Sequence, residues 1–236
     1  MRSLSRHVVA IGSGGFQGSN FATPLDAYIL SLVERKVPRV CFIPTAVGDS
    51  GDRIAHFYEV MGREPCELTH LPLFGSPGRS MDEHLADQDV IYVSGGNTAN
   101  LLVIWRLHGL DQALEKRAEA GDVVVCGPSA GGLCWFDCGV TDSFTLDLGP
   151  LDDGMGWIKG SFCPHYDEEP RRHPVYRELI SSGRLPSGIA ADGGAAAHYV
   201  DGELPAVLAE RPNAPVHTLA LRDGTLDEHP LEARAL

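Results

Sequence analysis

Four short apolar runs, each followed closely by a glycine or proline, constrain most strongly what this chain can fold into. They span residues 8–11, 40–43, 90–93 and 123–126. Nearly every position in them is apolar, which is typical of strands buried on both faces, because a strand with one wet face alternates apolar and polar residues. Such strands belong to a parallel sheet, so we predict an α/β fold with helices on both faces of that sheet.

The stretches between these runs have helical spacing. Residues 23–35 carry apolar side chains at Leu25, Ile29, Leu32 and Val33, and residues 99–107 carry them at Leu101, Leu102 and Trp105. Apolar residues three or four positions apart lie on one face of a helix, so both stretches are predicted helices that cover the sheet. The chain of 236 residues shows no internal repeat or linker, and we predict a single domain, 1–236.

Beyond residue 140 the pattern changes to short strand-like pieces. They span residues 189–191, 196–200, 206–208 and 216–221, with Asp-Gly pairs at Asp201-Gly202 and Asp223-Gly224. Asp-Gly is favoured in two-residue hairpin loops. We predict that these pieces add antiparallel strands to the edge of the same sheet, which makes it mixed, and that the tail at 227–236 frays.

Charge, the start of the chain and the cysteines limit the function classes. The net charge is −13 and no large basic cluster is present, which argues against a nucleic-acid partner. The first apolar run is too short for a signal peptide or a membrane span, so we expect a cytoplasmic protein without a membrane partner. The 6 cysteines include no C-x-x-C pair, which predicts reduced, mostly buried thiols.

The strongest chemical signal is Ser129, in the run Gly127-Pro128-Ser129-Ala130-Gly131-Gly132. A nucleophile on a tight strand-to-helix turn needs small neighbours, because the backbone is strained and larger side chains would clash. The helix that follows would direct the Ala130 N–H toward a developing oxyanion. A glycine-rich turn with Ser129 as an N-cap is the alternative interpretation.

A second glycine turn, Ser94-Gly95-Gly96-Asn97-Thr98, follows the run at 90–93. Paired glycines allow a backbone N–H to approach a substrate carbonyl, and Gly96 is our predicted second oxyanion donor. Asn97 is a candidate substrate contact, although a helix cap is the simpler role for it.

A serine nucleophile needs a base, and the chain has 10 histidines. His165, in Cys163-Pro164-His165-Tyr166, lies well past the serine and follows a proline that fixes its approach. We therefore predict His165 as the base. His173 and His198 are the competing candidates.

These motifs in this order, together with Val140-Thr141-Asp142-Ser143, resemble peptidase E, the aspartyl dipeptidase family, whose wider relatives include cyanophycinases. The resemblance extends over most of the chain, and four motifs in order are more specific than any one alone. It implies a flavodoxin-like sheet similar to that of class I glutamine amidotransferases, with Ser129 where those enzymes carry cysteine. It also implies a homodimer and a small peptide as substrate.

The resemblance further implies a serine peptidase with a Ser-His-acid triad and an acyl-enzyme on Ser129. Asp142 best matches the acid of the family. Asp137 and Asp192 stay open as alternatives, because the acid must reach the far nitrogen of His165. Asp192 also matches a family position near the site, which makes it a candidate substrate-site residue.

Peptidase E relatives cleave dipeptides with an N-terminal aspartate, and that side chain needs a cation. Arg171 and Arg172 are the predicted partners, because a guanidinium can hold a carboxylate with two hydrogen bonds, and the resemblance implies that Arg172 matches the aspartate-binding position of the family. The surrounding segment, 167–174, is acidic, so a salt-bridged surface turn is an equal alternative. A cyanophycinase-like isopeptidase and a non-catalytic family member are the competing functions.

Two other patterns are set aside. The run Gly12-Ser13-Gly14-Gly15-Phe16-Gln17-Gly18 has Gln17 where a dinucleotide loop needs its third glycine, so we interpret it as a rim of the hydrolase pocket. The acidic and histidine residues at 165–173 lack the helix-spaced HExxH pattern. We therefore predict neither a cofactor nor a metal.

Overall fold

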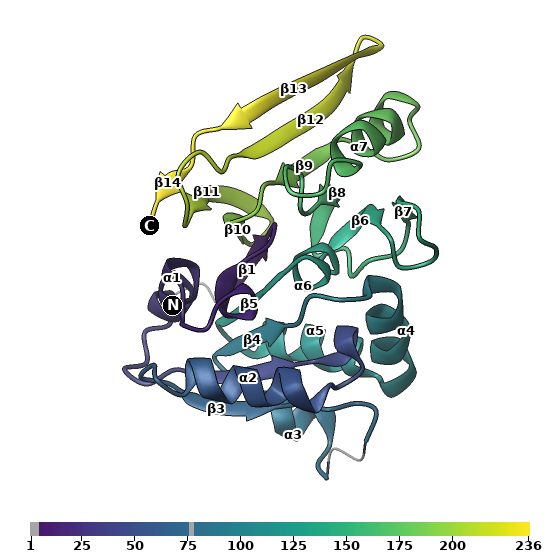
Figure 1. Cartoon of the computed structure of the whole chain (residues 1–236). Helices are drawn as coiled ribbons and strands as arrows, with labels where there is room; N and C mark the ends of the chain where they lie inside the picture. Colours follow the sequence, from purple (N-terminus) through teal and green to yellow (C-terminus); the bar gives the residue numbers. More distant parts are fainter. Residues whose placement is uncertain (1–4, 76–77) are drawn as a thin grey trace.

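Two β-sheets form the framework of the chain in a computed structural model, which describes residues 5–75 and 78–236 (Figure 1). The larger sheet has eight strands in the order β14-β11-β10-β1-β5-β4-β2-β3. These are β1 (Arg6–Ile11), β2 (Arg39–Ile43), β3 (Glu67–His70), β4 (Val90–Val93), β5 (Val123–Pro128), β10 (Ala195–Val200), β11 (Glu203–Ala209) and β14 (Arg234–Ala235). Strands β1 to β5 run parallel, and the four predicted apolar runs are the four central strands.

Helices cover both faces of this sheet, as predicted. They are α1 (Pro24–Ser31), α2 (Gly51–Met61), α3 (Met81–Leu85), α4 (Thr98–His108) and α5 (Leu110–Ala120). Successive residues of a strand point to opposite faces. Accordingly Val9 lies in the core cluster with α1 and α2, whereas Val8 lies in the cluster with α3, α4 and α5. The two predicted helices correspond to α1 and α4.

A second sheet of six strands, in the order β13-β12-β9-β8-β6-β7, carries the other half of the fold. Its elements are β6 (Phe136–Thr141), β7 (Gly149–Leu151), β8 (Ile158–Cys163), β9 (Gly188–Ala191), β12 (Val216–Arg222), β13 (Thr225–Leu231) and the packed helix α7 (Arg172–Ser181). Buried side chains of α7 join those of the sheet in a separate core cluster. Figure 1 shows the hairpin β12–β13 extending from the edge of this sheet.

The prediction of one sheet was therefore right for two of the four late pieces and wrong for the other two. β10 and β11 add antiparallel strands beside β1, as expected. β9 instead pairs in parallel with β8, and β12 pairs with β9, so both belong to the second sheet. The prediction failed because β8 was not identified from the sequence. The predicted fraying tail was also wrong, since it forms most of β13 and then β14.

Both predicted Asp-Gly turns are hairpin turns. The φ angles are 52° and 89° at Asp201 and Gly202, and 50° and 77° at Asp223 and Gly224. Two consecutive positive φ angles are what a two-residue turn of type I′ requires. These pairs join β10 to β11 and β12 to β13.

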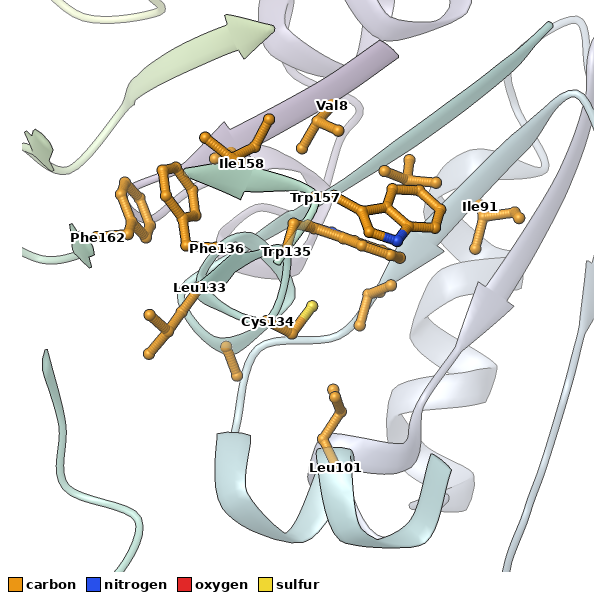
Figure 2. Close-up of a cluster of buried hydrophobic side chains, with 14 of the residues drawn as sticks. Val8, Ile91, Leu101, Leu133, Cys134, Trp135, Phe136, Trp157, Ile158 and Phe162 are labelled. Atoms are coloured by element: carbon orange, nitrogen blue, oxygen red, sulfur yellow. The ribbon is translucent and has the colours of Figure 1, made fainter. Parts of the chain in front are cut away.

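A buried aromatic core follows the short helix α6 (Ala130–Leu133) and connects the two sheets (Figure 2). The rings of Trp135 and Trp157 lie with centroids 4.7 Å apart, and the stacked rings of Phe136 and Phe162 have centroids 4.8 Å apart. Large aromatic side chains bury much apolar area in fixed geometry. This core therefore holds the chain firmly just after Ser129.

All six cysteines are free thiols, and five of them are buried, in agreement with the prediction. Burial raises the pKa of the Cys41 thiol to about 12. Within the part of the chain that the structure describes, no helix has the length and apolar character needed to cross a membrane.

Candidate active site

Ser129 occupies a strained turn between β5 and α6. Its φ and ψ are 54° and −114°, and its side chain belongs to a partly exposed residue. The Ser129 N–H donates to the Ile11 carbonyl at 3.0 Å, and the Ser129 carbonyl accepts from the N–H groups of Gly132 and Leu133 at 3.0 and 2.8 Å. A positive φ at a non-glycine residue persists when surrounding bonds over-determine it, and such residues cluster at functional sites. The geometry is that of a nucleophile elbow.

The glycines on either side of Ser129 are required by the end of β4. A Cβ atom at Gly127 would lie 2.2 Å from the Val93 carbonyl oxygen, and one at Gly131 would lie 2.3 Å from the same atom. Neither position accepts a side chain without moving the backbone. The two strand ends therefore approach closely because both residues are glycine.

The predicted oxyanion turn lies beside this elbow. A Cβ atom at Gly95 would lie 3.6 Å from Cβ of Ser129, and Gly96 has a φ of 136° with the Ala46 carbonyl oxygen 2.3 Å from where a Cβ would stand. The Gly95 N–H donates to Oε1 of Gln17 at 3.0 Å. Among the hydrogen bonds of the described residues, none uses the Gly96 N–H, and Ala130, at the first position of α6, has no acceptor within its helix.

His165 follows β8 and is held by Glu168. His165 has a φ of 54°, a side chain 22% exposed, and its Nδ1 lies 3.0 Å from Oε2 of Glu168. The same oxygen accepts a hydrogen bond of 2.6 Å from Oγ of Ser13. A carboxylate on Nδ1 fixes the ring orientation and leaves Nε2 for proton transfer. Glu168 thus has the contact that a triad acid makes.

None of the three acids considered from the sequence makes this contact. Asp142 is exposed and follows β6, with no hydrogen bond to His165 among the described contacts. Asp137 binds Nζ of Lys159 at 3.1 Å and the Gly160 N–H at 3.1 Å. Asp192 is only 6% exposed, and its Oδ1 has no hydrogen-bond partner in the described structure. Asp192 nevertheless lies near the loop of His165. It directly follows Ala191, whose carbonyl accepts a hydrogen bond of 3.1 Å from the Tyr166 N–H.

Sequence reasoning missed Glu168 although the signal was available. The residue lies three positions after His165, a spacing at which two side chains meet on one face of a helical turn. From sequence alone it belongs to the acidic segment 167–174, which is equally compatible with a salt-bridged surface turn. The Glu168 side chain, however, points back to the histidine.

The competing histidines have other partners. His198 is buried on β10, and its ring nitrogens contact Nδ1 of His7 at 2.9 Å and the hydroxyl of Tyr28 at 2.8 Å. His173 is 52% exposed, with Nε2 3.7 Å from a carboxylate oxygen of Glu228. His198 has no ring nitrogen left to act as a base in this arrangement.

The two predicted arginines differ in their surroundings. The Arg172 side chain is only 4% exposed and donates to Glu169 at 2.7 Å and to the Val140 carbonyl at 3.1 Å. Its Nε and one of its two terminal nitrogens are thus already engaged within the fold. Arg171 is 61% exposed, and among the described residues its side chain bonds an exposed carboxylate, Asp147, at 2.6 Å. An exposed ion pair of this kind is weak, so Arg171 can exchange partners.

Asn97 is the N-cap of α4. Its Oδ1 accepts from the Asn100 N–H at 2.8 Å, and its Nδ2 donates to the Ser143 carbonyl at 3.0 Å. Both ends of the side-chain amide are therefore engaged. The capping interpretation is confirmed.

Glu168 also lines a pocket of about 420 Å³. Its polar lining includes Ser13, Thr23, Glu168, Glu210 and Arg211. The pocket has room for a small ligand and presents both charge signs. Over the described residues, no three His, Cys, Asp or Glu side chains gather in a way that could hold a metal ion.

Comparison with known proteins identifies the family of the chain. The model of peptidase family S51 matches residues 8–207. The chain belongs to peptidase family S51. Because this is a family of serine peptidases, the chain is a serine peptidase by membership.

Individual proteins are similar to the chain over nearly its whole length. The uncharacterized peptidase YgaJ of Bacillus subtilis (strain 168) is 43% identical over 233 residues, which cover 98% of this chain and 99% of that protein. The crystal structure of a peptidase from an acI-B1 Actinobacterium superposes with a TM-score of 0.71 at 22% identity, covering 97% of this chain and 94% of that one. A putative peptidase E protein from Listeria monocytogenes EGD-e gives a TM-score of 0.56 at 16% identity, with 97% and 100% covered. The two structures support the fold alone.

The hairpin β12–β13 lies beyond the family S51 match yet contacts the loop of His165. Oε1 of Glu228 accepts a 2.8 Å hydrogen bond from the Tyr166 hydroxyl, and its other oxygen pairs with Arg177. His217 lies between two carboxylates, with Nδ1 3.9 Å from Glu228 and Nε2 3.7 Å from Asp192. Nothing in the sequence pattern indicated that the last strands support the active-site loop.

Proposed function

We propose that the chain hydrolyses small peptides through an acyl-enzyme on Ser129, with His165 as general base and Glu168 as the carboxylate that orients it. The observation that carries the proposal is the backbone of Ser129. A positive φ that is fixed by three hydrogen bonds and surrounded by glycines has no structural need of serine, and it presents the hydroxyl at the end of β5.

In this proposal His165 Nε2 removes the hydroxyl proton as Ser129 Oγ attacks the substrate carbonyl. The tetrahedral oxyanion accepts hydrogen bonds from the N–H groups of Gly96 and Ala130. His165 then gives the proton to the leaving amine, and a water molecule hydrolyses the ester by the same steps in reverse order. Glu168 stabilises the imidazolium that forms twice in each cycle.

A dipeptide with an N-terminal aspartate is the first substrate proposal, with Arg171 as the partner of the aspartate side chain. We prefer Arg171 to Arg172 for this role, because the Arg172 side chain is buried and already bonds Glu169 and the Val140 carbonyl. Arg171 would exchange the exposed Asp147 for the substrate carboxylate. We expect Arg171→Gln to raise KM for aspartyl dipeptides with little change in kcat.

The second proposal is a cyanophycinase-like isopeptidase. The observation that favours it is the pocket beside Glu168, where Glu168 and Glu210 would attract a cationic substrate group more than an anionic one. Product analysis with aspartyl dipeptides and β-aspartyl-arginine peptides separates the two substrate classes.

The central test is Ser129→Ala. We expect turnover of every substrate in that panel to fall by about 10³-fold or more, because both the nucleophile and the acyl-enzyme are lost. A fluorophosphonate probe should label the wild-type serine and leave the variant unlabelled. Full activity in a folded Ser129→Ala variant would refute the mechanism, and absence of probe labelling in folded wild type would favour a non-catalytic family member.

A further inference from the structure

We infer that Gln17 is a positioning residue for the oxyanion turn, an inference that rests on the proposed acyl-enzyme mechanism. The Gln17 side chain bridges two groups of that turn: Oε1 accepts from the Gly95 N–H at 3.0 Å, and Nε2 donates to the Val93 carbonyl at 3.4 Å. A Cβ atom at Gly95 would lie 3.9 Å from this Oε1 and 3.6 Å from Cβ of Ser129. Gly95 thus lies close both to the Gln17 amide and to Ser129.

The bridge imitates the pairing of a neighbouring strand. In a parallel sheet, one residue bonds the C=O of a partner residue and the N–H two positions further along. Gln17 bonds the C=O of Val93 and the N–H of Gly95 in this way with its side-chain amide. It therefore extends the support of β4 beyond the last residue of the strand, to the point where the glycines would otherwise leave the backbone free.

This contact selects which N–H group can face the substrate. The Gly95 N–H is occupied by Gln17, and the Asn97 N–H is occupied by the Ala46 carbonyl at 2.9 Å. The Gly96 N–H lies between them and makes none of the hydrogen bonds found among the described residues. Gln17 and Ala46 thus hold the turn from both sides of the proposed donor.

The contact also reaches the nucleophile through Val93. The Val93 carbonyl oxygen that accepts from Gln17 is the atom packed against Gly127 and Gly131. A rotation of that peptide would either press into these two glycines or open a gap beside them. Fixing the Val93 carbonyl therefore fixes the distance between the oxyanion turn and the Ser129 elbow.

Gln17 is itself held in place by its neighbours. It lies in the 3-10 turn η1 (Gly15–Gly18), and the adjacent Phe16 is fully buried, with its ring centroid 4.7 Å from that of Tyr92 and 5.5 Å from that of Phe57. The buried Asp26 accepts from the Thr23 N–H at 2.8 Å and from the Tyr92 hydroxyl at 3.1 Å. The side-chain amide is thereby presented from a rigid base, as positioning requires.

Two variants test the inference. Gln17→Met keeps the length of the side chain and removes both hydrogen bonds, and we expect kcat to fall about tenfold with KM changed less than twofold, because the loss concerns the transition state. Gln17→Glu keeps the shape and the acceptor but opposes the Val93 carbonyl and adds negative charge near the oxyanion. We expect its kcat to fall about 100-fold.

A transition-state mimic gives a readout that a merely structural role would not change. Inhibition by a peptide boronic acid, whose boronate oxygen occupies the oxyanion position, should weaken in each variant by the same factor as kcat/KM. The matched control is Gln88→Met, since the Gln88 side chain is likewise hydrogen-bonded, to Thr69 at 3.2 Å, but precedes β4 at its other end. Melting temperatures of all three variants identify any loss that comes from unfolding.

The outcomes distinguish this inference from the mechanism on which it rests. Retention of activity in Ser129→Ala would refute the mechanism. If Ser129→Ala is inactive but folded Gln17→Met and Gln17→Glu keep kcat within twofold of wild type, the positioning role alone is refuted. A rise in KM with unchanged kcat and unchanged boronate inhibition would overturn it as well, because Gln17 would then bind substrate rather than hold the oxyanion turn.

Discussion

The surroundings of Ser129 and those of His165 are held together by different kinds of contact. Around Ser129 the determining contacts are between backbone atoms and glycines, and a single strand-turn-helix segment supplies most of them. Around His165 the determining contacts are between side chains. These side chains come from Ser13 after β1, from Glu168 in the loop after β8 and from Glu228 in the hairpin β12–β13. A local backbone motif can be predicted from one stretch of sequence, whereas contacts between side chains that lie far apart in the sequence cannot.

The largest expected effect concerns the surroundings of His165. Glu168→Gln removes the negative charge from Nδ1 of His165 and permits the wrong tautomer, so kcat should fall about 10³-fold. Asp192→Asn and Asp142→Asn should each lower kcat less than tenfold. Steady-state kinetics of the three variants at one pH are the measurement.

The same three variants can also show that an acid other than Glu168 acts on His165. If Asp192→Asn is the severe variant and Glu168→Gln is mild, His165 turns during catalysis to the buried Oδ1 of Asp192, which accepts no hydrogen bond among the described residues and has only the distant Nε2 of His217 beside it, at 3.7 Å. A severe Asp142→Asn would instead restore the acid expected from the sequence. The ratio of the three kcat values therefore identifies the acid that acts in turnover.

A second prediction concerns the buried side chain of His198 in the larger sheet and its effect on stability at low pH. Burial, with the nearby His7 and Arg234, lowers the pKa of His198 from 6.5 to about 4. Unfolded chains take up this proton near pH 6.5 and the folded chain does not, so stability falls as the pH falls from 6.5 to 4. Each pKa unit corresponds to about 1.4 kcal/mol, which makes the loss about 3 kcal/mol at most.

Denaturant unfolding of wild type and His198→Gln at several pH values tests this. The free energy of unfolding of the variant should change less between pH 6.5 and 4 than that of wild type. Parallel curves for the two proteins would show that His198 does not titrate in the expected window. The histidine pair would then contribute nothing to the acid sensitivity of the larger sheet.

The smallest expected effect tests the support from the hairpin. Glu228→Gln weakens the contacts with Tyr166 and Arg177, and kcat should fall about tenfold as the His165 loop loses its fixed position. Asp227→Asn is the matched control, because Asp227 lies on the other face of β13 and pairs with Arg222 at 3.2 Å within the hairpin. Equal kcat values for the two variants at equal melting temperature would show that the hairpin does not support the loop of His165.

What the sequence could predict follows the same division. The four central strands, α1, α4 and both Asp-Gly turns were predictable because continuous apolar runs, helical spacing and turn residues act locally. The second sheet was not, since β8, with Lys159 and Gly160 inside it, does not read as a buried strand. Glu168, Gln17 and Glu228 were missed because their partners are set by how loops meet in space.

The strained backbone at Ser129 has a consequence for how relatives of this chain evolve. At a φ of 54° and a ψ of −114°, glycine is the comfortable residue, and serine persists at a cost to stability of about 1–3 kcal/mol. Once a lineage no longer needs the hydroxyl, drift toward glycine at this single position stabilises the fold. Under the proposed mechanism, serine is retained at this position because its hydroxyl is needed, and glycine there in a relative would indicate that the relative has lost the activity.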